Sequence, residues 1–178
     1  MGGATGDGPS RRCGQARRRA GPGPGVGLQA LLAQFPDAQV WGVDVSAVML
    51  SQARKRNQSE VTAGRLTLLE GGVSALSASE PADIVMANHV LYFWQNPAAE
   101  MAQIRGSLRP GGLLALGYQL KQNMPAMAQR RFPPAGHHLY EADDEVSRLA
   151  IVAGFGSVTH VVKGPTDAPE GRVMLATA

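Results

Sequence analysis

From Gly25 onward, segments with helical hydrophobic spacing alternate with short apolar runs typical of buried strands. The helical spacing predicts helices at residues 26–34, 47–57, 97–108 and 141–155. The apolar runs predict strands at residues 38–45, 65–70, 82–90, 113–119, 157–163 and 172–178. Strands that alternate with helices form mostly parallel sheets with helices on both faces. The sequence therefore predicts a doubly wound α/β fold.

The last two predicted strands, residues 157–163 and 172–178, have no helix between them. Strands joined by a short turn pair antiparallel, so we expect a C-terminal antiparallel hairpin at one edge of the sheet. The chain of 178 residues shows no internal repeat, and the alternation continues without a break after residue 21. We therefore expect one domain over residues 21–178, preceded by a Gly/Arg-rich tail over residues 1–20.

A glycine-rich loop precedes the first predicted helix, with glycines at positions 21, 23, 25 and 27. Glycine lets backbone approach a ligand closely, and the free N–H groups at a helix start favour negative charge. The spacing fits neither the dinucleotide fingerprint G-x-G-x-x-G nor the P-loop, which needs Gly-Lys-Ser/Thr. Asp44, at the end of the next predicted strand, can accept hydrogen bonds from both hydroxyls of a ribose. Together these features indicate a nucleoside-binding site.

Several motifs together resemble those of the class I S-adenosylmethionine-dependent methyltransferases: GPGPG, WGVDVSAVMLSQA, LTLLEGGVSAL, ADIVMANHVLYFW, MAQIRGSLRPGGLLALG and AGFGSV. The resemblance covers the chain from residue 21 onward. It implies a Rossmann-like methyltransferase fold with S-adenosylmethionine as the cofactor. It also implies that Gly21, Gly23 and Gly25 face the methionine part of the cofactor, and that Asp44 binds its ribose.

The adenine end of this implied site departs from the family pattern. The resemblance places Val45 beside the adenine, and Asn88, at the end of the fourth predicted strand, over the reactive methyl group. After the third strand the family usually reads Gly-Asp-Ala, whereas this chain reads Gly71-Gly72-Val73. The acid that accepts a hydrogen bond from the adenine amino group is therefore missing. We expect the adenine to rely on the backbone N–H of Val73 and on apolar walls.

The region before the glycine loop departs further. The family's first strand is apolar, central in the sheet, and carries an acid two residues before the first glycine. Here Arg19 stands at that position, after the run RRCGQARRRA. Because burying an unpaired charge costs on the order of several kcal/mol, we expect the first strand to be lost. We then expect the chain to be marginally stable or aggregation-prone and to bind the cofactor poorly. An altered reading frame, a wrong start site or a splice would each leave the glycine loop intact.

The net charge of +3 comes from the N-terminus, where the first 20 residues carry five arginines and one aspartate, leaving a net charge of −1 for the rest. A basic arm can bind nucleic acid. This one has no Val, Ile, Leu or aromatic residue to fold with, so we expect a disordered tail and no nucleic-acid partner. No apolar run reaches the roughly 18 residues of a membrane span, and no secretory signal is visible. We expect a cytoplasmic protein without membrane contact.

Two side chains near the predicted site have two interpretations each. His89 is the candidate general base, because imidazole titrates near neutral pH; the alternative is a packed, hydrogen-bonded histidine. Tyr92 can line an apolar substrate pocket with the two aromatic residues that follow it, or it can belong to an aromatic core. His137 and His138 are adjacent and have no nearby cysteine, so we expect no metal site.

The sequence favours methyl transfer from S-adenosylmethionine to an oxygen, nitrogen or carbon of a small-molecule acceptor. The reaction would be an in-line displacement at the sulfonium methyl, to which the protein contributes positioning and a dry site. Two alternatives stay open. One is a non-catalytic remnant of the fold, and the other is a binding module that uses the basic N-terminal arm.

Overall fold

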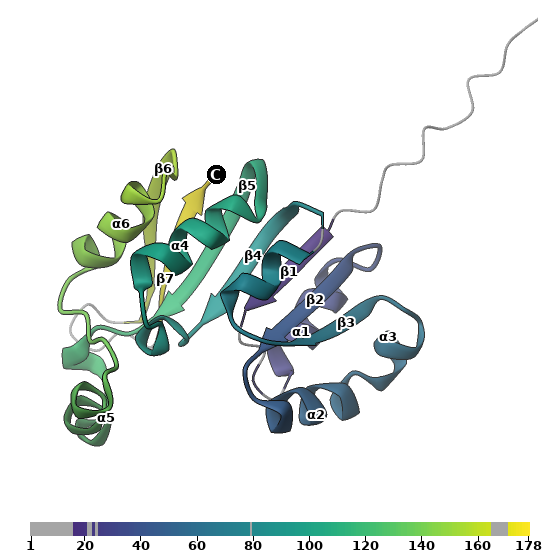
Figure 1. Ribbon diagram of the computed structural model, residues 1–178, viewed down its shortest axis with the longest axis horizontal. Coiled ribbons are helices and arrows are strands. Elements are labelled where there is room, and N and C mark those ends of the chain that lie inside the picture. The colour runs from purple at the N-terminus through teal and green to yellow at the C-terminus, as the bar shows by residue number, and fades with distance from the viewer. Residues whose placement is uncertain (1–15, 21–22, 24, 79, 165–170) are drawn as a thin grey trace, which may run out of the picture.

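The computed structural model describes residues 16–20, 23, 25–78, 80–164 and 171–178, with the backbone alone at residues 16–20, 77 and 78 (Figure 1). The strands are Ala16–Ala20 (β1), Gln39–Asp44 (β2), Leu66–Glu70 (β3), Ala82–Asn88 (β4), Leu108–Tyr118 (β5), Ser157–Lys163 (β6) and Gly171–Thr177 (β7). The α-helices are Val26–Gln34 (α1), Ala47–Arg56 (α2), Gln58–Thr62 (α3), Pro97–Gly106 (α4), Ala126–Arg131 (α5) and Asp143–Val152 (α6). Short 3-10 helices are Val73–Ala78 (η1), Leu91–Phe93 (η2), Lys121–Asn123 (η3) and Pro133–Ala135 (η4).

The strands form one sheet in the order β3-β2-β1-β4-β5-β7-β6. The five strands from β3 to β5 pair parallel, whereas β7 pairs antiparallel with both β5 and β6. The predicted α/β fold with a C-terminal antiparallel hairpin is confirmed. The strand order reverses between β1 and β4, and ligands of open α/β sheets bind outside the carboxyl ends of the strands at such a point.

The expectation that the first strand is lost is wrong for the backbone of residues 16–20. These residues form β1 and pair in parallel register with β2 on one side and with β4 on the other. Strand pairing uses backbone N–H and C=O groups, which arginine supplies as well as valine does. Without β1, the facing edges of β2 and β4 would have no partner. Residues 1–15, the rest of the predicted tail, lie outside the described residues.

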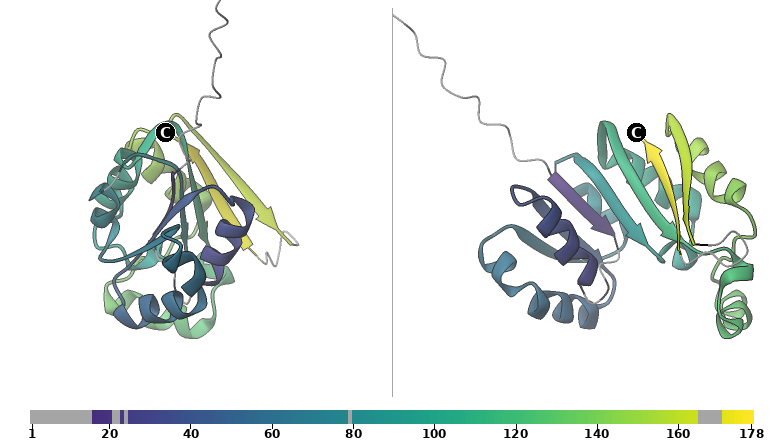
Figure 2. Two further views of the ribbon diagram at one scale, coloured as in Figure 1. Left: turned by 90° about the vertical axis from the view of Figure 1, so that its right-hand side faces the viewer. Right: turned by 180° about the vertical axis from the view of Figure 1, so that it is seen from behind.

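Helices cover both faces of the sheet (Figure 2). On one face, α4 and α6 pack against the central strands in a buried cluster that includes Val85, Leu114, Leu116, Met174, Met101, Ile104, Val146 and Ala150. On the other face, α1 packs against β2 and β3 in a second cluster formed by Leu28, Leu31, Leu32, Ala38, Val40, Ala53 and Leu66. The two clusters anchor the parallel strands, so the carboxyl ends of these strands are held at one edge of the sheet.

The segment Arg109-Pro110-Gly111-Gly112 belongs to a strand, whereas the sequence interpretation placed it as a break before the predicted strand at residues 113–119. It lies within β5, where the pairing with β4 shifts register between Ala82 and Ile84. Gly111 has a φ of 75°, and its N–H donates to the carbonyl of Ala178 at 2.8 Å. The glycines thus form a bulge that keeps the strand paired instead of breaking it.

Short elements without apolar periodicity were not predicted, namely α3, α5 and the 3-10 helices. In the described part of the chain, no helix combines the length and apolarity that crossing a membrane requires.

Candidate functional site

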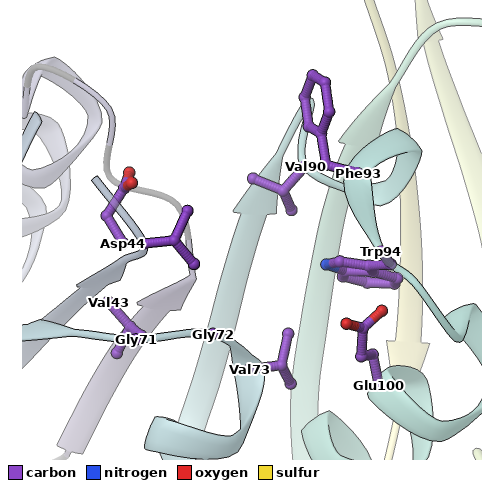
Figure 3. Close-up of a pocket in the computed structure, with 10 residues that line it drawn as sticks. Val43, Asp44, Gly71, Gly72, Val73, Val90, Phe93, Trp94 and Glu100 are labelled. Atoms are coloured by element: carbon purple, nitrogen blue, oxygen red, sulfur yellow. The ribbon is translucent and has the colours of Figure 1, made fainter. Parts of the chain in front are cut away.

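A cavity of about 240 Å³ opens at the carboxyl ends of β2, β3 and β4. Figure 3 shows Asp44 on one side of it and Trp94 with Glu100 on the other, with the segment from Gly71 to Val73 between them. The lining residues are Val43, Asp44, Val45, Gly71, Gly72, Val73, Val90, Phe93, Trp94 and Glu100. Four residues that the sequence assigned to cofactor binding, Asp44, Val45, Gly72 and Val73, are therefore together in one cavity.

Asp44 is held in place by backbone N–H groups on two sides. Its Oδ1 accepts a hydrogen bond from the N–H of Ser46 at 2.9 Å, and its Oδ2 accepts one from the N–H of Gly23 at 3.3 Å. Ser46 also caps α2 through its side chain, which accepts from the N–H of Met49. The end of β2 and the start of α2 thus fix a half-buried carboxylate at the cavity, with capacity for further hydrogen bonds.

The glycines of the loop before α1 have different roles. A Cβ added at Gly23 would meet nothing within 4 Å, so this position leaves open space beside Asp44. A Cβ at Gly25 would lie 2.8 Å from the side-chain nitrogen of Asn57 and 2.9 Å from the Cα of Ala53. Gly25 therefore allows α1 and α2 to approach closely, a packing role in addition to the cofactor role that the sequence assigned. Gly21 lies outside the described residues.

Alanine substitutions at the two glycines should separate these roles. Gly25→Ala combines a φ of 88° with a steric clash, so we expect it to lower the free energy of unfolding by about 2–4 kcal/mol. Gly23→Ala has a φ of 50° and no clash, so it should cost only about 1–2 kcal/mol. Urea unfolding of both variants measures the difference. Equal losses would contradict the packing role of Gly25.

The loop after β3 forms the floor of the cavity. The N–H of Gly71 donates to the backbone carbonyl of Asp44 at 3.0 Å, which ties the ends of β2 and β3 together. Gly72 would admit a Cβ without any contact within 4 Å, so nothing in the described protein fills the space above it. Val73 is buried, whereas Val45 is 74% exposed. This loop offers backbone N–H groups and open space, as an adenine-binding segment needs.

Asn88 and His89 lie where β4 ends, outside the lining of this cavity. A Cβ added at Gly117 of β5 would clash with Oδ1 of Asn88, so glycine there makes room for this side chain. His89 has a φ of 54°, which is uncommon for a residue with a side chain, and its N–H donates to the carbonyl of Gly117 at 2.8 Å. Partial burial lowers the pKa of the His89 imidazole, which favours its neutral form.

Tyr92 belongs to the packed interior and does not line the cavity. Its hydroxyl accepts a hydrogen bond from the N–H of Gln119 at 2.6 Å and lies 3.4 Å from Nδ1 of His89. Its ring contacts those of Phe93 and Phe132. Burial raises the pKa of the Tyr92 hydroxyl, which the Gln119 N–H lowers in part. These contacts favour the aromatic-core interpretation of Tyr92.

The sequence interpretation missed Glu100, which enters the cavity from the first turn of α4. An acid in the first turn of a helix has an ordinary explanation in the helix dipole, so the sequence carried no signal for another role. Trp94 was identified as an aromatic candidate, and it forms a wall of the cavity. Within the described residues, no group of three or more His, Cys, Asp or Glu side chains is arranged to hold a metal ion.

Comparisons with known proteins agree with this geometry. A family profile described as a methyltransferase domain matches residues 19–116. The trans-aconitate 2-methyltransferase of Methylobacterium nodulans is 30% identical over 136 residues, which cover 73% of this chain and 50% of the relative. The chain thus spans about half the length of this relative.

Solved structures show the same fold at low sequence identity. An O-methyltransferase family protein from Burkholderia thailandensis is 17% identical, with a TM-score of 0.73, over 92% of this chain and 50% of its own. The phosphoethanolamine N-methyltransferase 2 of Haemonchus contortus, solved in complex with S-adenosyl-L-methionine, is 16% identical with a TM-score of 0.71, over 92% of this chain and 48% of its own. Because the methyltransferase-domain profile matches more than half of the chain, the chain belongs to the class I methyltransferase family, whose cofactor is S-adenosylmethionine.

Proposed function

We propose that this chain transfers a methyl group from S-adenosylmethionine to an oxygen of a small carboxylic acid. The observation that carries the proposal is the cavity at the strand ends, which is lined both by the fixed carboxylate of Asp44 and by Gly72 with its open space. A carboxylate at this place can bind ribose hydroxyls, and the open glycine can admit a flat base. The described residues therefore fit the adenosine part of the cofactor.

The residues have separate tasks in this proposal. Asp44 accepts hydrogen bonds from the ribose hydroxyls, and the N–H of Val73 donates to the adenine ring. Gly23 leaves room for the cofactor beside the start of α1. Asn88, at the end of β4, stands toward the reacting methyl group, as the family resemblance implies. Trp94 and Val90 exclude water from the apolar wall of the cavity.

S-adenosylmethionine supplies an electrophilic methyl group. As the acceptor oxygen forms a bond to this methyl carbon, the bond between carbon and sulfur breaks, and sulfur keeps the electron pair. The protein lowers the barrier by holding the two reactants in line and away from water. A carboxylate acceptor is already deprotonated at neutral pH, so it needs no base. His89 can take a proton only if the acceptor is a hydroxyl or an amine.

The acceptor class is inferred from the curated relative, which is named for methylation of trans-aconitate. We therefore expect a small acid as substrate, with neither a nucleic-acid nor a membrane partner. Location in the cytoplasm stays a prediction from the sequence, as does the domain boundary at residue 21.

A methylation assay tests the proposed function. Purified chain is incubated with methyl-labelled S-adenosylmethionine and either trans-aconitate, a monocarboxylic acid, a phenol or a primary amine. We expect labelled methyl ester from an acid, detected by mass spectrometry, at a rate at least roughly tenfold above that of Asp44→Ala, since each lost hydrogen bond to charge costs about 1.5–3 kcal/mol. Label on the amine or phenol alone would overturn the acceptor class. A folded chain that labels none of the acceptors would support the non-catalytic remnant.

A further inference from the structure

The Glu100 side chain enters the cofactor cavity from the side opposite Asp44 (Figure 3). It comes from the first turn of α4, and its carboxylate lies next to the ring of Trp94 and near Val73 in this view. Its Oε2 atom is buried and has no hydrogen-bond partner among the described residues. A buried acceptor without a partner costs free energy unless a ligand satisfies it.

A purely structural role for Glu100 explains only part of this arrangement. Backbone N–H groups of Gln95 and Asn96 stabilise the charged carboxylate in part, although burial outweighs them and raises the pKa of Glu100. The start of α4 is already capped, because the side chain of Asn96 accepts from the N–H of Ala99 at 3.2 Å. An acid that served only the helix dipole would do so equally well with both oxygens in water. The buried oxygen in the cavity therefore requires another explanation.

Apart from Glu100, the described residues that line this cavity offer no side-chain acceptor where the adenine is expected. The loop Gly71-Gly72-Val73 has no side-chain oxygen, and both oxygens of Asp44 are oriented by N–H groups at the ribose end. We propose that Glu100 binds the cofactor by accepting a hydrogen bond from the exocyclic amino group of its adenine, in place of the acid that this loop lacks. The proposal rests on the proposed function, since it assigns a residue to the cofactor of that reaction.

The chemistry of the base gives a specific test. S-adenosylhomocysteine carries an amino group at the 6-position of its purine, whereas S-inosylhomocysteine carries a carbonyl oxygen there. A carboxylate accepts a hydrogen bond from the amino group. It forms none with the carbonyl oxygen, because both groups are acceptors. The amide of a Glu100→Gln variant accepts from the amino group through its oxygen and donates to the carbonyl through its nitrogen. The variant should therefore lose discrimination between the two ligands.

Calorimetric titration of both ligands measures this discrimination without any turnover. We expect the unmodified chain to bind S-adenosylhomocysteine roughly tenfold to a hundredfold more tightly than S-inosylhomocysteine. The ratio of the two affinities should fall at least about tenfold in Glu100→Gln. Contacts of Val73 with the base are present in the unmodified chain and in Glu100→Gln, so they do not affect the change in the affinity ratio. Glu80→Gln, at an exposed glutamate outside the cavity, is the matched control and should leave the ratio unchanged.

The stability of the ligand-free chain gives a second readout. Since burial raises the pKa of Glu100 from its ordinary value of 4.5, the folded chain binds this proton more tightly than the unfolded chain does. The stabilisation of the fold by this tighter proton binding is fully present below pH 4.5 and is lost as the pH rises through the raised pKa of Glu100. Glu100→Gln should therefore melt at a higher temperature than the unmodified chain at pH 7, although it discriminates less between S-adenosylhomocysteine and S-inosylhomocysteine. A residue that served only to stabilise α4 would give a lower melting temperature.

Three results would overturn the role of Glu100. The first is equal affinity of the unmodified chain for the two ligands, which needs no variant to fold. The second is an affinity ratio in folded Glu100→Gln within twofold of the unmodified ratio, a threshold well inside the expected change. The third is failure of a folded, unmodified chain to bind either ligand, which would overturn the proposed function as well. In the first two cases binding of S-adenosylhomocysteine persists, so the proposed function survives.

Discussion

Asp44→Ala should weaken the binding of S-adenosylmethionine by about 2–4 kcal/mol, because it removes two charge-assisted hydrogen bonds that water replaces only in part. The structure gives this carboxylate a fixed position, since the N–H groups of Ser46 and Gly23 orient its two oxygens. Isothermal titration calorimetry of the folded variant measures the loss. Binding as tight as that of the unmodified chain would mean that Asp44 does not contact the ribose.

Two further variants separate the cofactor contact from effects on folding. Asp44→Asn keeps an acceptor oxygen at the same place without the charge, so its affinity should lie between those of the unmodified chain and Asp44→Ala. Asp37→Ala removes an exposed aspartate at the opposite end of β2, and we expect unchanged affinity. A loss of binding in Asp37→Ala equal to that of Asp44→Ala would indicate a general effect of charge.

Replacing the arginines of β1 should have the largest stabilising effect among the proposed variants. Arg17 is in register with Val40 and Ile84, and Arg18 with Trp41 and Val85. An apolar residue suits a strand paired on both sides within a sheet that helices cover on both faces. Replacing charged by apolar residues at such central strand positions should stabilise the chain by about 1–4 kcal/mol, the range found when buried ion pairs are replaced by apolar groups. In a chain of this size that gain raises the melting temperature by roughly 3–12 °C.

The test variant combines Arg17→Val and Arg18→Val with Arg19→Glu, which restores the acid that the family carries before its first glycine. We expect it to melt at a higher temperature and to bind the cofactor more tightly than the unmodified chain. A matched control replaces the exposed cluster Arg54-Lys55-Arg56 of α2 by glutamines, which removes three positive charges outside the sheet. An equal rise of the melting temperature in the control, or no rise in the strand variant, would refute the effect of the β1 arginines.

Local patterns in the sequence predicted most of the fold. The helix over residues 26–34 and the strand over residues 157–163 occur with the predicted bounds, because leucines at helical spacing and a β-branched run each specify one structure. The predicted loss of β1 failed because that strand is specified by its neighbours. The backbone edges of β2 and β4 require a partner, and residues 16–20 supply one in spite of their side-chain preferences.

The candidate site was predictable where its residues follow directly from a strand end. Asp44 ends β2, and Gly72 and Val73 follow β3, so the strand pattern places them at one edge. Glu100 was not predictable, because it reaches the cavity from α4, and only the packed structure brings it there. The packing role of Gly25 likewise depends on Ala53 of α2 and on Asn57, which follows that helix, and no local pattern connects these residues to Gly25.

Titration of the purified 178-residue chain with S-adenosylmethionine is the most direct test of whether this chain is a working member of its family. Circular dichroism first establishes that the chain is folded, and calorimetry then measures the affinity and stoichiometry. We predict one binding site per chain with a dissociation constant in the micromolar range, about −8 kcal/mol, and a large loss of affinity in Asp44→Ala. A cooperatively folded chain that shows no binding at millimolar cofactor would contradict the proposed function and support a fold that has lost its cofactor.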